Sequence, residues 1–598
     1  MKYELEKPDN LVEFIEYGVK HYSDLPLFGT KNTQGVYEWV TYGEVGRRVD
    51  NLRGGLAKLG IGKGDAVGII ANNRTEWPIV AFAAYGVGGR YVPMYEAELV
   101  KIWQYIIADS GVKLLFVSKP EIYEKVKHFT KEIPTLKHIY IIEAEGENSM
   151  AALEKLGEAN PVQAYRPVPD EIAVLIYTSG TTGDPKGVLL SHGNISSNSH
   201  AGRKAYPELG KGDVTLSILP WAHSYGQTAE LYSVIYFGGS IGFMESTATL
   251  GDDIAKVRPT FLIAVPRVFN KIYDGIWTRM NHEGGLKKAL FVMAVNAGKK
   301  RRALAERGTS SFFTNLKFRI GDKLVFSKIR ERFGGRLKGA MTASAAMTVD
   351  IAHFFFDVGI PCYDCYGMSE TSPAATMNAS YAYKIGSVGK AIEKVRIVID
   401  KSVVEEGASD GEIIIYGPNV MKGYHNKPDQ TKEILTPDGG VRTGDRGRLD
   451  DDGFLYITGR IKEQFKLENG KFVFPASMEQ DIQLNQFVEN VMVYGENRRN
   501  TIGLIVPDFV VLERWAKEKG MTGTPQEIIG KKEVQDMISS EIVASLKGKY
   551  GGYEIPKRFV YIPENFTLDN GMLTQTMKLK RRVVVQKYAD LIEAAYKG

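Results

Sequence analysis

Residues 177–187 carry a pattern well suited to binding a polyphosphate. The stretch reads Tyr-Thr-Ser-Gly-Thr-Thr-Gly-Asp-Pro-Lys-Gly and follows an apolar run at 172–176 that predicts a buried strand. Glycines let backbone N–H groups turn toward an anion, hydroxyls add donors, and Lys186 adds a positive charge. The Walker pattern of a phosphate loop is absent. A merely flexible turn fits badly, because such turns do not usually carry Pro-Lys-Gly at a fixed place after a buried strand.

Residues 366–371, Tyr-Gly-Met-Ser-Glu-Thr, place a carboxylate close to an aromatic ring and a hydroxyl. Glu370 suits Mg²⁺, which binds a few carboxylate oxygens together with substrate phosphates and water. Alone, this segment would be an ordinary turn with a surface acid. Cys362 and Cys365 have the spacing of one of the two ligand pairs of a zinc site. A single pair supplies two ligands at most, so we expect these cysteines at the end of a strand rather than in a zinc site.

The elements that must position these residues belong to a large globular protein. At 598 residues the chain is too long for one ordinary core, and 43% hydrophobic with 25% charged residues is typical of a well-packed protein. A net charge of +5 gives no argument for nucleic-acid binding. Two cysteines suit a reducing compartment, and the sequence has neither a secretory signal nor an apolar run of about 18 residues. We therefore expect a cytoplasmic protein.

Short apolar runs alternate with helical patterns over most of the chain. Strands are predicted at 66–70 and 113–117, and helices at 76–86 and 99–107. This alternation favours an α/β fold with parallel or mixed sheets covered by helices. The apolar segment 231–244, interrupted by glycines, fits either a buried strand pair or a cavity wall.

The pattern of predicted strands and helices changes after about residue 385. Short strands at 411–417 and 453–457 predict a small β-rich subdomain, and the tail mixes strands and helices as a smaller α+β domain does. We therefore predict a large domain over residues 1–459 and a small, mobile C-terminal domain over residues 460–598.

Residues 177–187 and 366–371 resemble the phosphate loop and the aromatic-Gly-x-Thr-Glu segment of the adenylate-forming superfamily. That superfamily includes acyl-CoA synthetases, firefly luciferase and the adenylation domains of peptide synthetases. Ser369 stands where threonine is commoner in the family. Further matches follow in family order, and the resemblance runs from about residue 10 to about residue 590: they lie at 342–346, at Tyr424, at 442–445, at 458–462 and at 573–581.

The resemblance implies ATP, Mg²⁺ and coenzyme A as reactants or cofactors, and it implies roles for single residues. Lys578, His223 and Glu370 would be catalytic, with Glu370 holding the metal, and Lys462 would be the hinge between the domains. Choosing Lys578 over Lys580 rests on alignment, since the loop lacks the Pro and Gly that many members have near Gln575 and Met577. The implied cofactor-binding residues are Thr178, Ser179, Gly180, Thr181, Thr182, Gly183, Lys186, Ser344, Ala345, Tyr366, Gly367, Met368, Ser369, Asp445, Arg460, Lys462 and Lys466.

The acid substrate is indicated by three further segments. Residues 219–226 resemble the loop that lines the acid pocket, with His223 beside the carboxylate. Residues 257–271, the basic segment 299–338 and the lysine loop are similar to those of long-chain acyl-CoA synthetases, which implies a medium- to long-chain fatty acid. The residues after His223 depart from the long-chain pattern. Four alternative functions stay open: an aryl-acid or other carboxylic acid ligase, a ligase loading a carrier protein, a luciferase-like oxygenase and a non-catalytic nucleotide sensor.

Residues 299–338 contain thirteen Lys or Arg against three Asp or Glu. They form either a solvated helical face or a patch that rests peripherally on anionic lipid or attracts an anionic substrate. Both interpretations stay open, as does a homodimer.

Overall fold

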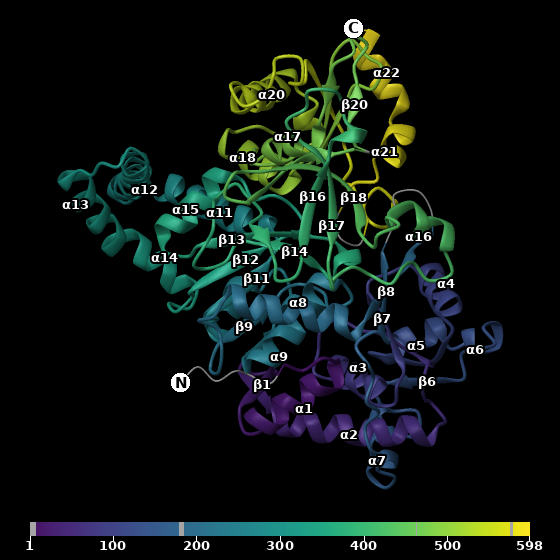
Figure 1. Ribbon diagram of the computed structural model, residues 1–598. Coiled ribbons are helices and arrows are strands. Elements are labelled where there is room, and N and C mark those ends of the chain that lie inside the picture. The colour runs from purple at the N-terminus through teal and green to yellow at the C-terminus, as the bar shows by residue number, and fades with distance from the viewer. Residues whose placement is uncertain (1–6, 179–183, 462, 575–577, 598) are drawn as a thin grey trace. The chain divides into compact units, whose positions relative to one another are not determined.

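The computed structural model of the chain describes residues 7–178, 184–461, 463–574 and 578–597 (Figure 1). It divides into two compact units, which are described separately. Unit 1 comprises Met1–Val398, Ile414–Thr443 and Leu449–Tyr456, and unit 2 comprises Ile399–Ile413, Gly444–Arg448 and Ile457–Gly598. The predicted boundary between residues 459 and 460 stays a prediction.

A six-stranded sheet in unit 1 carries the predicted phosphate loop. Its strand order is β6-β5-β3-β4-β7-β8, and the strands pair in parallel except for β8, which runs antiparallel to β7. The predicted strands at 66–70 and 113–117 are β3 and β5, buried on both faces as continuous apolar runs require. The bounds are β3 (Ala66–Ile70), β4 (Arg90–Met94), β5 (Val112–Val117), β6 (His138–Ile141), β7 (Ile172–Thr178) and β8 (Lys186–Ser191).

Helices cover both faces of this sheet, because alternate residues of each strand enter different cores. Val67 and Phe116 belong to the core that also contains the inner faces of α2 and α3, whereas Ile70 and Val117 pack with α4, α5 and α6. The structure thus confirms the expected helix-covered α/β architecture. The helices are α1 (Leu11–Tyr22), α2 (Tyr42–Lys58), α3 (Glu76–Gly86), α4 (Val100–Ser110), α5 (Pro120–Val126), α6 (Phe129–Glu132) and α7 (Met150–Glu158).

A second, five-stranded sheet has the order β11-β12-β13-β14-β15 and is parallel over its first three strands. The carboxyl ends of these strands lie at one edge, where ligands of open α/β sheets usually bind. The two segments predicted to bind the nucleotide base, 342–346 and 366–371, begin at this edge. The strands are β11 (Phe261–Ala264), β12 (Gly339–Thr342), β13 (Cys362–Gly367), β14 (Ala374–Met377) and β15 (Lys390–Ala391), and η3 (Ser369–Thr371) follows β13.

A four-stranded sheet of order β2-β1-β10-β9 and its neighbouring helices complete this part of unit 1. The strand-pair interpretation of residues 231–244 is wrong, because their first half is helical; a helix buried on all sides has no period that separates it from a strand. The elements are β1 (Pro26–Lys31), β2 (Tyr37–Thr41), β9 (Val214–Ser217), β10 (Ser240–Phe243), α8 (His192–Ala205), the π-helix η1 (Tyr225–Tyr232), α9 (Ser233–Phe237) and α10 (Leu250–Val257).

The basic segment 299–338 is largely helical, and Figure 1 shows α12 and α13 at the periphery of unit 1. No helix among the described residues is long and apolar enough to cross a membrane. The helices of this region are α11 (Pro266–Glu283), α12 (Gly285–Glu306), α13 (Phe312–Gly321), the π-helix η2 (Asp322–Phe326), α14 (Ser327–Arg332) and α15 (Val349–Val358).

The β-rich segment expected after residue 385 forms a sheet of order β16-β17-β18-β19. Its strands are β16 (Arg396–Asp400), β17 (Gly411–Tyr416), β18 (Val441–Leu449) and β19 (Leu455–Arg460), and η4 (Lys401–Val403) and α16 (Pro428–Ile434) lie between them in the chain.

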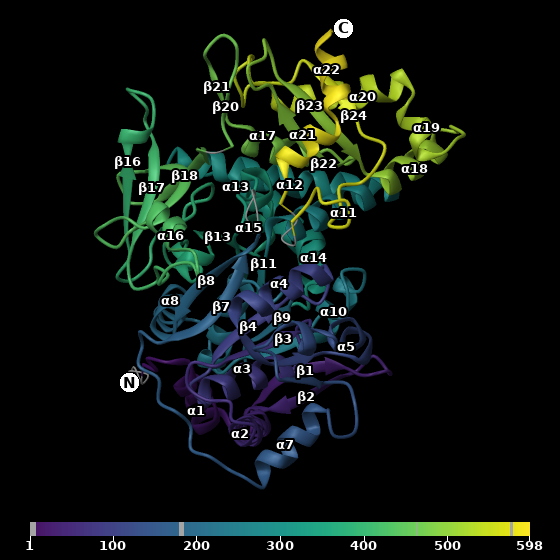
Figure 2. The same cartoon turned by 90° about the vertical axis from the view of Figure 1, so that its right-hand side faces the viewer.

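The C-terminal part of unit 2 is an α+β body built on the sheet β22-β23-β24 (Figure 2). Val493 and Ile505 pack with α17, α18 and α20, whereas Met492 and Leu504 pack with the residues around α21 and α22. The elements are β20 (Phe465–Lys466), β21 (Phe472–Val473), α17 (Pro475–Ile482), β22 (Val488–Tyr494), β23 (Ile502–Pro507), α18 (Phe509–Glu518), α19 (Pro525–Ile529), α20 (Lys532–Leu546), β24 (Arg558–Tyr561), α21 (Arg581–Lys587) and α22 (Ala589–Lys597).

Candidate active site

The two ends of the predicted phosphate loop meet across a strand pair. Thr178, the last residue of β7, is the register partner of Lys186, the first residue of β8. Ser179, Gly180, Thr181, Thr182 and Gly183 lie outside the described residues. Gly187 has little room for a side chain, because a Cβ there would lie 3.0 Å from the Tyr177 ring and 3.3 Å from Cβ of His425.

Tyr424 joins the phosphate loop to the segment that contains Glu370. The Lys186 ammonium lies 5.0 Å from the centre of the Tyr424 ring, a cation–π distance. The phenol of Tyr424 donates a hydrogen bond of 2.6 Å to Oε1 of Glu370. Burial and the neighbouring Glu370 charge raise the pKa of Tyr424 well above its usual range, so the phenol remains a donor at neutral pH. One ring therefore positions a cation and a carboxylate beside each other.

Glu370 fits the chemistry of a magnesium ligand. It is buried, and among the described residues only Tyr424 donates to its carboxylate, which leaves Oε2 for a ligand. Among the described residues there is no group of three or more His, Cys, Asp or Glu that could hold a metal. A single carboxylate suits Mg²⁺, which commonly takes one or two protein carboxylates and fills its remaining positions with substrate phosphates and water.

The acid loop and the Ser369 segment, far apart in sequence, are in contact. The hydroxyl oxygens of Ser224 and Ser369 lie 3.0 Å apart in the buried interior. His223 precedes this contact and is partly exposed. The backbone N–H of Tyr225 donates to Nδ1 of His223 at 3.2 Å, so the neutral ring carries its proton on Nε2. The structure thus brings His223 and Ser369 into one neighbourhood.

The loop expected to contact adenine is held by Asp364, a residue that the sequence interpretation did not select. Asp364 accepts hydrogen bonds from the Thr342 hydroxyl and from the backbone N–H of Met347, which bracket this loop. Burial raises the pKa of Asp364 to about 6. Within the loop, before Ala345, Ser344 has a φ of 73°, a left-handed conformation that a non-glycine residue seldom adopts. Such strained residues are frequent at ligand sites.

The segment after β13 has little room for larger residues. A Cβ on Gly367 would lie 1.8 Å from the carbonyl oxygen of Pro373, so only glycine fits between Tyr366 and Met368. The backbone N–H of Met368 donates to the Thr371 hydroxyl at 2.9 Å, which closes the turn and orients Ser369 and Glu370.

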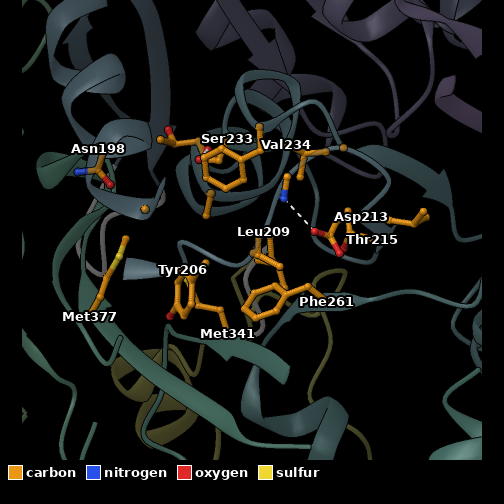
Figure 3. Close-up of a pocket in the computed structure, with 18 residues that line it drawn as sticks. Asn198, Tyr206, Leu209, Asp213, Thr215, Ser233, Val234, Phe261, Met341 and Met377 are labelled. Atoms are coloured by element: carbon orange, nitrogen blue, oxygen red, sulfur yellow. Dashed lines mark hydrogen bonds between the residues drawn. The ribbon is translucent and has the colours of Figure 1, made fainter. Parts of the chain in front are cut away.

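A narrow cavity of about 50 Å³ lies within unit 1 (Figure 3). It adjoins the π-helix η1, which begins directly after Ser224, because Thr228 and Ala229 of η1 lie in its wall. The second interpretation of residues 231–244, a cavity wall, is confirmed by several lining residues. Most of the wall is apolar and includes Tyr206, Ser233, Val234, Phe237, Phe261, Ile263 and Met341.

Tyr225, the first residue of η1, lies in the chain between His223 and the cavity-lining residues Thr228 and Ala229. Its buried phenol donates to the carbonyl oxygens of Ala264 and Met341, each at 3.2 Å. Thr215 and Thr228 lie in the cavity wall, and their buried hydroxyls have no hydrogen-bond partner among the described residues. The wall is therefore mainly apolar, with Asn198, Asp213 and Ser233 as further polar residues in it.

In unit 2, Asp445 and Arg460 form an ion pair. Nε of Arg460 donates to Oδ1 of the buried Asp445 at 2.6 Å. Lys466 is exposed and lies 5.6 Å from the centre of the Phe472 ring. Lys462 lies outside the described residues.

The basic residues of the C-terminal lysine loop differ in exposure and in their contacts. Leu573 and Leu579 form an isolated bridge, and the Thr574 N–H donates to the carbonyl of Lys578 at 2.8 Å. Lys578 is exposed at the end of this turn, whereas Arg581 pairs with the partly buried Glu479. Arg581 thus has a structural contact rather than belonging to a solvated charge run. Gln575 and Met577 lie outside the described residues.

Glu230 is a buried acid that anchors the acid loop. Its Oε2 accepts hydrogen bonds from the Ser217 hydroxyl at 2.6 Å and from Nε1 of Trp221 at 2.7 Å, and Oε1 has no partner among the described residues. Asn73 extends this network by accepting from the Trp221 backbone N–H at 2.8 Å. Burial raises the pKa of Glu230 to about 8, so the side chain is mostly protonated at neutral pH. The sequence signal that could have pointed to Glu230 is an acidic residue directly before the apolar segment 231–244.

We predict that Glu230→Gln makes the stability of unit 1 less dependent on pH. A glutamate side chain in the unfolded chain ionises near pH 4.5, whereas Glu230 holds its proton to about pH 8, so folding becomes less favourable as pH rises between these values. Each pH unit in that window costs about 1.4 kcal/mol. The free energy of unfolding can be measured by urea unfolding followed by tryptophan fluorescence at pH 5.5 and 7.5. Between these two pH values the variant's free energy of unfolding should increase relative to that of the wild type by roughly 2–3 kcal/mol. Exposed Glu121→Gln is the control, and parallel pH profiles would contradict the assignment.

Comparisons with known proteins agree with this geometry. A family model described as "AMP-binding enzyme" matches residues 18–425, and one for its C-terminal domain matches residues 462–598. The chain is 32% identical to peroxisomal long chain acyl-CoA synthetase 6 of Arabidopsis thaliana, over 99% of this chain and 87% of that protein. It is 31% identical to the long-chain-fatty-acid–CoA ligase FadD15 of Mycobacterium bovis, over 94% and 93%.

Solved structures share the fold. The adenylation domain of a carboxylate reductase from Mycobacterium chelonae aligns with a TM-score of 0.77 at 22% identity, covering 98% of this chain and 91% of that one. An anthranilate CoA ligase bound to anthranoyl-AMP aligns with a TM-score of 0.72 at 18% identity, covering 99% and 98%. On the family matches and the full-length relatives, the chain belongs to the AMP-binding enzymes and, within them, to the long-chain acyl-CoA synthetases.

Proposed function

We propose that the protein is an ATP-dependent, AMP-forming fatty acid–CoA ligase that acts on medium- to long-chain acids. The observation that carries the proposal is the pairing of Lys186, Tyr424 and Glu370 at the end of the phosphate loop. It sets a cation for phosphate oxygens beside a carboxylate suited to magnesium. The full-length relatives named as long-chain acyl-CoA synthetases support the choice of acid and thiol.

In the first half-reaction a carboxylate oxygen of the acid attacks the α-phosphorus of ATP, and pyrophosphate leaves. The main barrier is repulsion between anions, so catalysis comes from positioning and charge stabilisation. Lys186 and the N–H groups and hydroxyls of residues 178–183 bind the phosphates, and Ser369 approaches the α-phosphate. Glu370 would hold Mg²⁺, which would supply positive charge against the phosphates. Lys578 bridges the incoming carboxylate and the α-phosphate.

The remaining site residues bind the nucleoside and the acid. Ser344, Ala345, Gly367 and Met368 form the surface against adenine, and Tyr366 stacks on its ring. Asp445 accepts hydrogen bonds from the ribose hydroxyls, with Arg460 and Lys466 as further nucleotide contacts. His223, with its proton on Nε2, donates to the acid carboxylate.

In the second half-reaction the thiol sulfur of coenzyme A attacks the acyl carbon, and AMP leaves with the former carboxylate oxygen. Lys578 is not needed for this step. A rotation of the domain formed by residues 460–598 about Lys462 withdraws it and opens the path for the thiol.

The mostly apolar side chains that line the cavity support a fatty acid over a short polar one, because an alkyl chain needs an apolar wall along its length. These side chains must move apart to admit a long chain, because the cavity is narrow. An aryl or other carboxylic acid, and a carrier protein as acyl acceptor, are the alternatives that an acid panel separates.

We also propose a cytoplasmic location with peripheral membrane contact through residues 299–338. A homodimer is a further proposal for the assembly of the chain. The two free, buried cysteines support a reducing compartment.

The decisive assay is AMP release with a panel of acids, with and without coenzyme A. We expect release with medium- and long-chain fatty acids and a strong dependence on coenzyme A. Lys578→Ala should lower adenylate formation by about a hundred- to a thousand-fold, since it removes a charge that stabilises the transition state.

The matched control for that variant is Lys580→Ala, two residues along the same loop, which should retain activity within about five-fold. Supplied with preformed acyl-AMP, Lys578→Ala should still form the thioester. Turnover independent of coenzyme A, or none with any acid, would overturn the assignment, and equal losses in the two variants would overturn the role of Lys578.

Lys462→Pro should separate the two half-reactions. Proline fixes the backbone φ at the hinge and blocks rotation, so adenylate formation is retained and thioester formation falls. Pre-steady-state measurement of both steps, with Lys462→Ala as the control that leaves the backbone free, tests this. Equal loss of both steps in the proline variant counts against the hinge.

A further inference from the structure

An apolar stripe on the α13–η2 segment is exposed to solvent. Phe312 and Phe313 are 75% and 74% exposed, and Leu316, Ile320 and Leu324 are 44%, 41% and 45% exposed. Phe312, Leu316, Ile320 and Leu324 follow one another at spacings of four residues, so they lie on one side of the helical segment. Single exposed apolar residues are ordinary, but five in one stripe mark an interaction surface.

The opposite side of the same segment anchors it to the fold. Thr314 and Gly321 are buried, and a Cβ on Gly321 would lie 2.6 Å from Cβ of Ala294 in α12. Phe318 packs 5.9 Å from Phe326, and the Arg301 guanidinium lies 4.6 Å from the Phe318 ring centre. The outward direction of the stripe is therefore fixed by packing on the inner side.

The basic residues of the segment serve two purposes. Arg302 pairs with Asp357, Arg330 with Asp322 and Lys338 with Asp213, so these three hold the structure together. By contrast, four exposed basic residues next to the stripe make no ion pair among the described residues: Lys317, Arg319, Lys323 and Lys328. At about 3.6 residues per turn, Arg319 and Lys317 fall on opposite edges of the stripe.

A groove between α12 and α13 adjoins the stripe. Arg301 and Arg319 line it together with Thr309, Ser310, Ser311 and Asn315. Two guanidinium groups and several hydroxyls are the donors that bind a phosphate group. The groove thus adds an anion-binding feature next to the exposed phenylalanines.

We propose that the α12–α13–η2 surface docks on an anionic phospholipid bilayer, with the stripe at Phe312, Phe313, Leu316, Ile320 and Leu324 inserted between headgroups. An apolar face bounded by basic residues is the arrangement of helices that lie in a membrane interface. A second copy of the chain fits less well, because a two-fold interface would bring the same unpaired positive charges together. The inference deepens the proposed function, because a long-chain acid partitions into such a bilayer.

The test is flotation of the full-length protein with vesicles of pure phosphatidylcholine or of phosphatidylcholine with phosphatidylglycerol. We expect binding to the anionic vesicles, weaker binding to the neutral ones, and a decline with salt. The triple variant Phe312→Ser, Phe313→Ser, Leu316→Ser should bind both vesicles at least about ten-fold more weakly. Lys317→Gln, Arg319→Gln, Lys323→Gln should lose mainly the preference for anionic vesicles, by about ten-fold or more.

Matched controls test whether the effect is specific to this surface. Val510→Ser removes an apolar side chain that is 77% exposed in unit 2, and Lys125→Gln, Lys131→Gln, Lys137→Gln removes three exposed charges elsewhere on unit 1. Both should bind vesicles as the wild type does. Sedimentation in solution checks for a stripe-dependent dimer.

Absence of vesicle binding by the wild type, unchanged binding by both stripe variants, or a dimer that the phenylalanine substitutions dissolve would each overturn the proposal. Because flotation requires no turnover, its failure is distinct from failure of the ligase assignment. Coenzyme-A-dependent AMP release with a water-soluble medium-chain acid should be unchanged in the stripe variants, which also shows that they fold.

Discussion

The hydrogen bond from the Tyr424 phenol to the Glu370 carboxylate, with the Lys186 ammonium against the same ring, connects three distant parts of the sequence. Burial keeps the phenol protonated, so the bond persists at neutral pH. Lys186 begins β8, Glu370 follows β13, and Tyr424 precedes α16, so two different sheets must be in place before the arrangement can exist. The fold of unit 1 therefore has to form before this cation and this carboxylate come together.

Elsewhere in unit 1, buried acids hold two of the predicted site loops. Asp364 holds the loop expected to contact adenine, and Glu230 holds the loop that bears His223. Both acids are buried with raised pKa values, so they act as hydrogen-bonding anchors and need not be charged. The cavity that Thr228 and Ala229 of η1 line has a mainly apolar wall, which suits the proposed alkyl chain of the acid.

Local patterns predicted much of the fold. The helix expected at 76–86 and the strand expected at 66–70 have those bounds, because continuous apolar runs between turn residues are strong signals. The same reasoning wrongly suggested a strand pair at residues 231–244, since a fully buried helix lacks a polar face. The motifs identified Glu370 and Lys186, but no spacing rule could join Ser224 to Ser369 or Asp364 to Thr342, because such contacts depend on how whole sheets pack. The predicted hinge at Lys462 and the role of Lys578 stay predictions.

The account centres on an acyl-adenylate formed at this site, and transfer of isotope tests it directly. The protein would be given a fatty acid labelled with oxygen-18 in its carboxylate, together with ATP and coenzyme A, and the AMP produced would be analysed by mass spectrometry. Attack of the carboxylate on the α-phosphorus predicts that each AMP carries one labelled oxygen. Unlabelled AMP, or label in pyrophosphate or orthophosphate, would contradict the proposed chemistry.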